Sequence, residues 1–194
     1  SLEDPVEYTI DGVNQSQVRP EIDYTFANGL RSILRQDPDI IMVGEIRDAE
    51  TARLAVQASL TGHLVLATLH TNNAAGVIPR LVDMGLEPYL LAATLVLAVG
   101  QRLAPTLCQD SKEAVPVTGG IKALFDDILT KIPAANRAKI KPSAEVYRGL
   151  RSATCPAGTR GRIAVFEVLE INREVEAVLL TKPTEEEITK VARA

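Results

Sequence analysis

The sequence predicts an α/β fold, in which a parallel β-sheet is flanked by helices and followed by a smaller α+β subdomain. Two short, continuously apolar runs, residues 39–44 (DIIMVG) and 63–70 (HLVLATLH), are typical of strands buried on both faces of a parallel sheet. Helical patterns with short joints alternate with these runs, as parallel strands require. Near residue 104 the alternation of apolar runs and helical patterns gives way to loop-like sequence. We therefore expect residues 1–103 to form the sheet domain and residues 104–194 the subdomain.

The elements of the first domain follow from apolar periodicity and from boundary residues. A strand end and a turn at Asp4-Pro5 come first. Residues 25–39 predict a helix, because apolar residues recur at i, i+4, i+7 and i+8 from Phe26, and the residue before Pro38 resists helical geometry. Residues 48–62 predict a second helix with an aspartate cap and a terminal glycine, and residues 72–85 predict a third.

The elements of the subdomain are predicted from weaker signals. Residues 104–120 are typical of a loop, residues 121–132 of an amphipathic helix, and residues 133–143 of irregular or weakly helical chain. Residues 160–171 (RGRIAVFEVLEI) favour a strand because they are rich in β-branched and aromatic side chains. Two helical segments follow, residues 172–180 and 184–194, the second with Thr184 as its cap.

Composition indicates a globular protein and excludes several function classes. Of 194 residues, 46% are hydrophobic and 24% charged, and a net charge of −4 without a basic run argues against a nucleic-acid partner. The longest apolar stretch, residues 89–99, is shorter than the roughly 20 residues of a membrane-spanning helix, so we expect it to be core. No signal peptide is visible, and two distant cysteines make no disulfide framework, so we expect reduced thiols in the cytoplasm.

Polar side chains follow three predicted strands, at the edge where open parallel sheets bind ligands. Glu3 and Asp4 follow the first strand, Glu45 the second, and His70 with Thr71 the third. Adjacent strands lie about 4.8 Å apart, so these groups can face one small ligand. Carboxylates beside a histidine suit a magnesium-bound phosphate, because they can hold the metal or its waters, activate a water and contact a phosphate oxygen.

The two histidines occupy opposite ends of one predicted strand. His63 precedes His70 by seven positions, which separates them by about 23 Å and turns them to opposite faces. They cannot share one ligand within a single subunit. His70 therefore has the position of a ligand-binding residue, whereas His63 lies at the other end, where a subunit boundary is one possible location.

A phosphate-binding loop is missing from this sequence. Such a loop needs a glycine-rich turn that ends in Lys and Ser or Thr. No Gly-Lys dipeptide occurs anywhere in the chain. If the site handles a nucleotide, we therefore expect half of it to lie outside this chain.

Three motifs, in order, resemble those of the secretion ATPases, which power type II secretion and type IV pilus assembly. Residues 2–8 (LEDPVEY) resemble the aspartate box, residues 39–52 (DIIMVGEIRDAETA) the Walker B region, and residues 61–81 (TGHLVLATLHTNNAAGVIPRL) the histidine box. Residues 30–39, 100–108 and 160–171 match the same family. The resemblance covers nearly the whole chain. From it we expect the sequence to be a carboxyl-terminal fragment that starts just past the Walker A loop.

The resemblance implies a RecA-like core that uses ATP and Mg²⁺. It implies a homohexamer at the cytoplasmic face of the inner membrane, peripherally associated through an inner-membrane platform protein. ATP hydrolysis would drive pilin or pseudopilin assembly. Because the Walker A loop is absent, we expect no ATPase activity from the isolated chain.

The resemblance also implies roles for individual residues. Glu45 corresponds to the Walker B glutamate, expected to orient or deprotonate the attacking water, and Glu3 is the competing candidate for the base. Glu45 or Asp4 would hold Mg²⁺ through water, and His70 would contact the γ-phosphate region. Arg47 is expected to hold the Walker B turn or a neighbouring acid. The nucleotide-binding set implied by the two boxes and the Walker B region is Asp4, Arg47, His63 and His70.

The cysteines depart from the family pattern. Assembly-type members usually carry two C-x-x-C pairs that bind zinc, but here Ser111 and Gly158 stand at the second positions after Cys108 and Cys155. A structural zinc site needs four ligands, so we expect two ordinary thiols and no zinc. A two-cysteine site completed by Asp110 or by a second chain is the alternative.

Three other functions compete with that of an assembly or secretion ATPase. A pilus retraction motor shares the three boxes but lacks the cysteine lobe, so the two cysteines favour assembly or secretion. A non-catalytic ring component would have no physical need for the acids Glu3, Asp4 and Glu45 beside His70. A DNA-processing RecA-like ATPase would need basic loops, whereas the basic residues of this acidic chain are dispersed.

Overall fold

The computed structural model describes residues 1–181 and 183–193, the side chain of Ala135 excepted, and the chain divides into two units. Unit 1 is built from residues 1–99 and 168–192, and unit 2 from residues 100–167 together with Arg193. This division differs from the expected boundary between residues 103 and 104. The two terminal helices, expected in the subdomain, belong to unit 1, because Val175, Leu179 and Ile188 are fully buried in its core.

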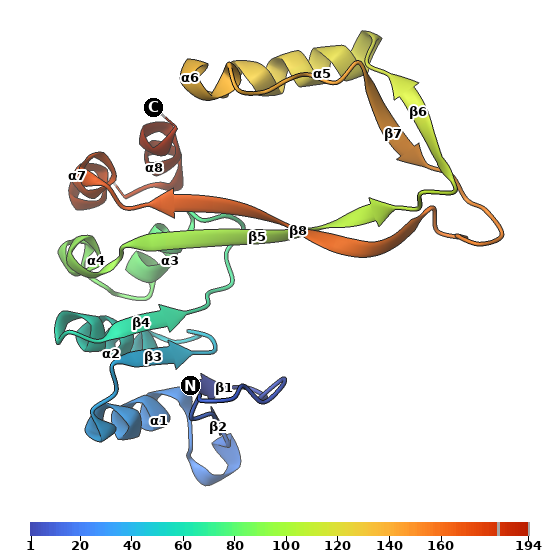
Figure 1. The fold of residues 1–194 in the computed structure, drawn as a ribbon. Helices are drawn as coiled ribbons and strands as arrows, with labels where there is room; N and C mark the ends of the chain where they lie inside the picture. The colour runs from blue at the N-terminus through green and yellow to red at the C-terminus, as the bar shows by residue number, and fades with distance from the viewer. Residues whose placement is uncertain (182, 194) are drawn as a thin grey trace. The chain divides into compact units, whose positions relative to one another are not determined.

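Unit 1 contains a sheet of four parallel strands in the order β2-β1-β3-β4 (Figure 1). The strands are β1 (Leu2–Glu3), β2 (Ser16–Gln17), β3 (Ile40–Val43) and β4 (Leu64–Ala67). Val43 pairs with Leu2 on one side and with Ala67 on the other, so the carboxyl ends of β1, β3 and β4 meet at one edge. The predicted α/β class is confirmed. Strand β2 was not predicted, because two residues carry no periodic signal.

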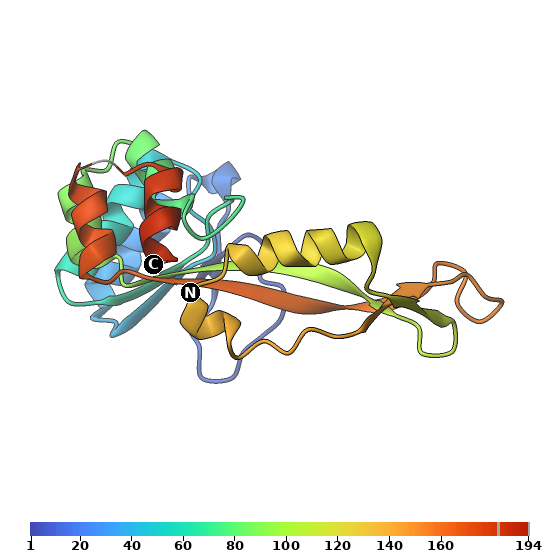
Figure 2. The ribbon, with the colours of Figure 1, turned by 90° about the horizontal axis from the view of Figure 1, so that it is seen from above.

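Helices of unit 1 cover one face of this sheet, as Figure 2 shows. They are α1 (Phe26–Ile33), α2 (Ala49–Leu60), α3 (Val77–Asp83), α4 (Pro88–Thr94), α7 (Arg173–Thr181) and α8 (Glu185–Ala192), with short 3-10 turns η1 (Pro20–Ile22) and η2 (Leu34–Gln36). All but α4 and η1 overlap segments predicted to be helical. The predicted aspartate cap is confirmed, since the Asp48 carboxylate accepts a hydrogen bond of 2.8 Å from the Thr51 amide.

The opposite face of the sheet is apolar and exposed in this chain. Ile41 and Val43 point into the core, whereas Ile40 is 61% exposed and Leu64, its partner on β4, is 56% exposed. The prediction that β3 and β4 are buried on both faces is therefore wrong for this chain, because its described helices cover only one face. A continuous apolar area of this kind is typical of a surface that other protein covers.

Unit 2 is built on two pairs of strands. β5 (Leu97–Leu107) pairs with β8 (Thr159–Glu170), and the antiparallel pair β6 (Lys112–Pro116) and β7 (Glu145–Gly149) follows, with α5 (Gly119–Thr130) and α6 (Ala134–Arg137) between them in sequence. The predicted strand at residues 160–171 and the helix at residues 121–132 are confirmed. The prediction of a loop over residues 104–120 is wrong, because strand pairing orders this segment. In the part of the chain that the structure describes, no helix has the length and hydrophobicity that a bilayer crossing demands.

Candidate functional site

Three strand ends of unit 1 come together as the sequence predicts. The backbone pairing continues past the strands, since the Gly44 amide donates to the Leu2 carbonyl at 2.7 Å and the Ile46 amide donates to the Thr68 carbonyl at 2.9 Å. The Thr68 hydroxyl also donates to the Gly44 carbonyl. These bonds fix the turn that carries Glu45 between the end of β1 and the segment that follows β4.

Gly44 is required by the close approach of β1. A Cβ atom at this position would lie 2.8 Å from the Leu2 carbonyl oxygen and 3.2 Å from the Glu3 Cα. We predict that Gly44→Ala lowers the free energy of unfolding by about 1–3 kcal/mol, because rigid backbone must move to admit the methyl group. Thermal unfolding measures this. Gly120→Ala is the matched control, since nothing lies within 4 Å of that position, and an equal loss in the control would contradict the steric argument.

Glu45 is the centre of a cluster of charged side chains. Its Oε1 atom is paired with the Arg47 guanidinium, and its Oε2 atom lies 3.3 Å from His70 Nε2. Arg47 also reaches Asp4, with Nη1 at 3.4 Å from Oδ2. The Glu45 side chain is only 14% exposed, whereas His70 is 89% exposed. The cluster therefore combines a largely buried carboxylate with an imidazole that is exposed to solvent.

The pairing with Arg47 changes the acidity of Glu45. The hydrogen bond from Arg47 lowers the pKa of Glu45 below its ordinary value of 4.5, partial burial opposes this, and His70 contributes a smaller lowering. The same pairing raises the pKa of Arg47. Glu45 is therefore a carboxylate at neutral pH, suited to accept hydrogen bonds and to face cations.

We predict that the Glu45 carboxyl titrates below pH 4.5 and that Arg47→Gln moves its midpoint back toward 4.5. A carboxyl with a depressed folded-state pKa stabilises the fold above its unfolded-state pKa, and this contribution is lost as the pH falls through the folded-state value. The variant should therefore lose less stability than the parent as the pH falls below 4.5. NMR titration of the carboxyl carbon measures the midpoint. Arg35→Gln is the control, and an equal shift there would contradict the assignment.

Glu3 lies in a different environment from Glu45. Its Oε1 atom accepts hydrogen bonds from the Ser1 hydroxyl at 2.5 Å and from Gln15 Nε2 at 2.9 Å. These bonds, that from Gln15 first, lower the pKa of Glu3. Sequence reasoning missed Gln15, which the parallel pairing of β1 with β2 brings beside Glu3.

His63 and Thr71 do not join the cluster. His63 precedes β4, at the end of the sheet opposite to Glu45, and its Nδ1 donates to the Ala58 carbonyl at 2.9 Å. The Thr71 hydroxyl donates to the Asn73 carbonyl at 3.0 Å, inside its own loop. Three of the residues expected at the strand ends are linked in one chain of contacts, in which Arg47 joins Asp4 to Glu45 and Glu45 contacts His70.

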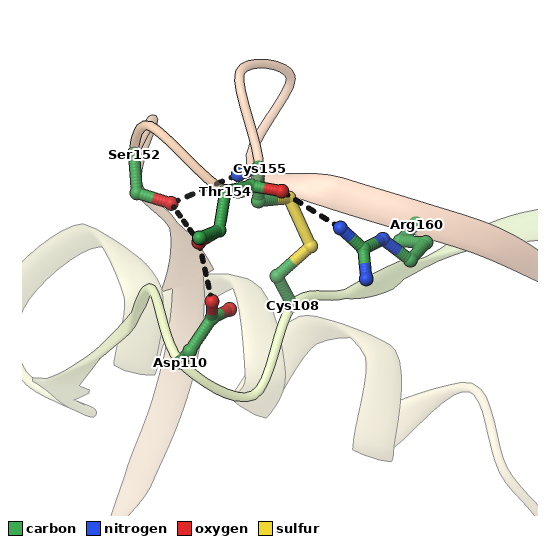
Figure 3. Close-up of a disulfide and its surroundings, with 6 residues drawn as sticks. All are labelled: Cys108, Asp110, Ser152, Thr154, Cys155 and Arg160. Carbon is green, nitrogen blue, oxygen red and sulfur yellow. Dashed lines mark hydrogen bonds between the residues drawn. A yellow bond between two sulfur atoms is a disulfide. The ribbon is translucent and has the colours of Figure 1, made fainter.

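The expectation of two free thiols is wrong, because Cys108 and Cys155 form a disulfide in unit 2 (Figure 3). Cys108 directly follows β5 and Cys155 lies four residues before β8, so the pairing of these strands brings the two sulfur atoms together. The signal was present in the sequence, but it required knowing that β5 and β8 are partners. Neither Cys108 nor Cys155 is therefore a free thiol in this structure.

The loops around the disulfide are joined by further polar contacts (Figure 3). The Thr154 hydroxyl donates to Asp110 at 2.6 Å, and Arg160 donates to the Thr154 carbonyl at 2.7 Å. The hydrogen bond from Thr154 lowers the pKa of Asp110. Asp110 therefore accepts a hydrogen bond from the Thr154 hydroxyl in this structure. Across the described residues, no three histidine, cysteine, aspartate or glutamate side chains are arranged to hold a metal ion.

The parallel sheet, its helical cover and the strand-end cluster define an α/β protein of the RecA-like type. The chain belongs to the type II/IV secretion system protein family, which matches residues 1–194. It is 46% identical to the type II secretion system ATPase E of Vibrio cholerae serotype O1, covering 100% of this chain and 37% of that protein. It is 44% identical to the type IV pilus assembly ATPase PilB of Thermus thermophilus, covering 100% and 21%, respectively.

Solved structures agree with this assignment. The pilus retraction motor PilT with bound ADP is 28% identical, with a TM-score of 0.62, over 95% of this chain and 42% of that chain. The Legionella pneumophila ATPase DotB is 27% identical, with a TM-score of 0.59, over 99% and 41%. In each comparison the chain spans less than half of the relative, between 21% and 37% for the two curated proteins named above.

Proposed function

We propose that this chain is part of an ATPase that couples ATP hydrolysis to the assembly of pilin or pseudopilin subunits. The observation that supports this best is the contact of Glu45 with Arg47 and His70 at the carboxyl edge of a RecA-like sheet. The relatives at 44–46% identity are named as a secretion ATPase and a pilus assembly ATPase, whereas the named retraction motor is 28% identical. Assembly or secretion is therefore favoured over retraction.

In this proposal Glu45 orients the attacking water, and His70 contacts the γ-phosphate region. A carboxylate with a lowered pKa is a weak base but a strong hydrogen-bond acceptor, which favours orientation of the water over removal of its proton. Glu3 is the weaker candidate, because its carboxylate is bonded to Ser1 and Gln15 and is not part of the cluster that joins Glu45 to Arg47 and His70. Arg47 holds Asp4 and Glu45 together.

Asp4 and Glu45 fit a magnesium site of the water-mediated kind. Both supply the carboxylate oxygens that Mg²⁺ prefers, and both are already paired with Arg47, which favours contact through metal-bound waters over direct ligation. A bound Mg²⁺ would neutralise phosphate charge at this edge. The resemblance to metal-dependent ATPases is the second support for it.

The free edge of β4 supports the expectation that part of the ATPase core lies outside residues 1–194. The Leu64 amide bonds to the Asp39 carbonyl on the β3 side, and neighbouring residues of a strand point their amides to opposite sides. Val65 and Ala67 therefore turn their backbone groups away from β3. Among the described residues, β3 is the one strand that pairs with β4.

In the part of the chain that the structure describes, the edge of β5 that faces away from β8 is likewise not paired with another strand. The Ile171 amide bonds to the Val96 carbonyl, so Val96 points toward β8, and Leu97 and Val99 point the other way. A cavity of about 260 Å³ lies between β4 and β5 and is lined by Val65, Ala67, Leu97 and Val99 among others. We infer that this slot accepts one further strand of the longer protein, which would satisfy both rows of backbone groups.

Assembly and location are proposed from the family resemblance. We propose a homohexamer at the cytoplasmic face of the inner membrane, bound peripherally through a platform protein, with no nucleic-acid partner. The net charge of −4 favours a protein partner over a polyanion.

The experiment compares this chain with the longer protein that contains it. We expect magnesium-dependent ATP turnover from the longer protein and none from residues 1–194 alone. Amide exchange provides a second readout, in which the amides of Val65, Ala67, Leu97 and Val99 should become protected in the longer protein. Turnover by the isolated chain would contradict the divided site, and an inactive longer protein would contradict the ATPase proposal.

A further inference from the structure

The segment between β4 and α3 carries His70 but gives its side chain little support. The imidazole is 89% exposed, and among the described residues its one polar contact is with Glu45, 3.3 Å from His70 Nε2 to Glu45 Oε2. The segment is anchored further along, where Ala74 and Ala75 are buried. The position of His70 therefore depends on how the intervening backbone is held.

Asn73 organises this backbone. Its carbonyl accepts a hydrogen bond from the Thr71 hydroxyl at 3.0 Å, and its Oδ1 atom accepts one from the Gly76 amide at 2.8 Å. The side-chain amide of Asn73 donates to Glu185 Oε1 at 2.6 Å, although Glu185 is 112 residues away in sequence. One residue thus joins the loop after His70, the start of α3 and the carboxyl-terminal helix α8.

Glu185 lies on a helix that is packed against the core of unit 1. It is the first residue of α8, whose amino end is capped by Thr184, with the Glu187 amide donating to the Thr184 hydroxyl at 3.4 Å. Ile188 of the same helix is fully buried against the core of unit 1. Acidic side chains are favoured in the first turn of a helix by the helix dipole, which is consistent with the place of Glu185 beside Asn73.

We propose that Glu185 is a positioning residue that, through Asn73, holds the loop bearing His70 in the geometry needed for turnover. α8 is then coupled to the catalytic edge of the sheet and not merely packed on the core. This inference rests on the proposed function, because the role of His70 belongs to the ATPase reaction. The three consecutive glutamates at the start of α8 are not equivalent under this proposal, because the hydrogen bond from Asn73 goes to Glu185.

The first test measures amide exchange over residues 68–76 of the chain. We expect Glu185→Ala to increase exchange in this segment about three- to tenfold, since an exposed charge-assisted hydrogen bond is lost. Glu185→Gln should stay within twofold of the parent, because its amide oxygen can still accept from Asn73. Glu186→Ala is the matched control, with the same charge change on the same helical turn. Unchanged exchange in Glu185→Ala would overturn the proposal.

The second test measures ATP turnover by the longer protein. We expect Glu185→Ala to lower kcat about three- to tenfold with KM for ATP within twofold, and Glu185→Gln to restore kcat. Thermal unfolding of each variant shows whether the fold is intact. A parent protein without turnover contradicts the proposed function itself. An active parent with equal kcat in Glu185→Ala and Glu186→Ala contradicts only the positioning role.

Discussion

Glu45→Gln in the longer protein is expected to lower ATP turnover about 100- to 1,000-fold. Glutamine keeps the shape of the side chain but replaces the acceptor oxygens that face Arg47 and His70 with a neutral amide. A neutral amide orients a water more weakly than a carboxylate and no longer balances the guanidinium, and losses of about this size follow the removal of such a group. Steady-state turnover at saturating ATP measures the effect.

Two further variants make the Glu45 result interpretable. Glu50→Gln is the control, because Glu50 pairs with Arg31 on the exposed surface of α1 and α2, and such pairs contribute little. Glu3→Gln tests the competing base and is expected to cost less than Glu45→Gln. A tenfold or smaller loss in Glu45→Gln, with a larger loss in Glu3→Gln, would assign the base to Glu3 instead.

Removing the disulfide is expected to lower the free energy of unfolding of unit 2 by about 2–4 kcal/mol. Cys108 and Cys155 are 47 residues apart, so the bond restricts a long loop in the unfolded chain. The loops should keep their native arrangement after reduction, because the Asp110–Thr154 and Arg160–Thr154 hydrogen bonds do not depend on sulfur. Denaturant unfolding with and without a thiol reductant measures the difference.

The matched variant is the double substitution of Cys108 and Cys155 by serine. Its stability should equal that of the reduced parent and should not respond to the reductant. Thiol titration of the unfolded chain without reductant should detect no free thiol in the parent. Two free thiols in freshly prepared protein, with no effect of reductant on unfolding, would contradict the disulfide.

Much of unit 1 could be predicted because its signals are local. The apolar run that became β3, the Asp48 cap and the proline that follows α1 each act within a few residues. The alignment of parallel strand ends then brings Glu45 to His70 without any knowledge of side-chain packing. The prediction that β3 is buried on both faces was wrong. A continuous apolar run is consistent with two covered faces, but it does not show whether the same chain covers both of them.

The parts that escaped prediction depend on partners distant in sequence. Residues 104–120 contain prolines and polar residues typical of a loop, yet β5 and β6 form there because β8 and β7 pair with them. The same strand pairing explains the disulfide. The contact of Glu185 with Asn73 could not be predicted either, because the two residues are 112 positions apart in sequence.

The sharing of Arg47 between Asp4 and Glu45 has an electrostatic consequence for how a nucleotide arrives. Two carboxylates and one guanidinium leave this edge with a surplus of one negative charge when His70 is neutral. Bare triphosphate would therefore be repelled at close range, and a divalent cation arriving with it would reverse the sign of the local field. Under the proposed function, the strand ends would therefore favour binding of a metal–phosphate complex over binding of the free anion.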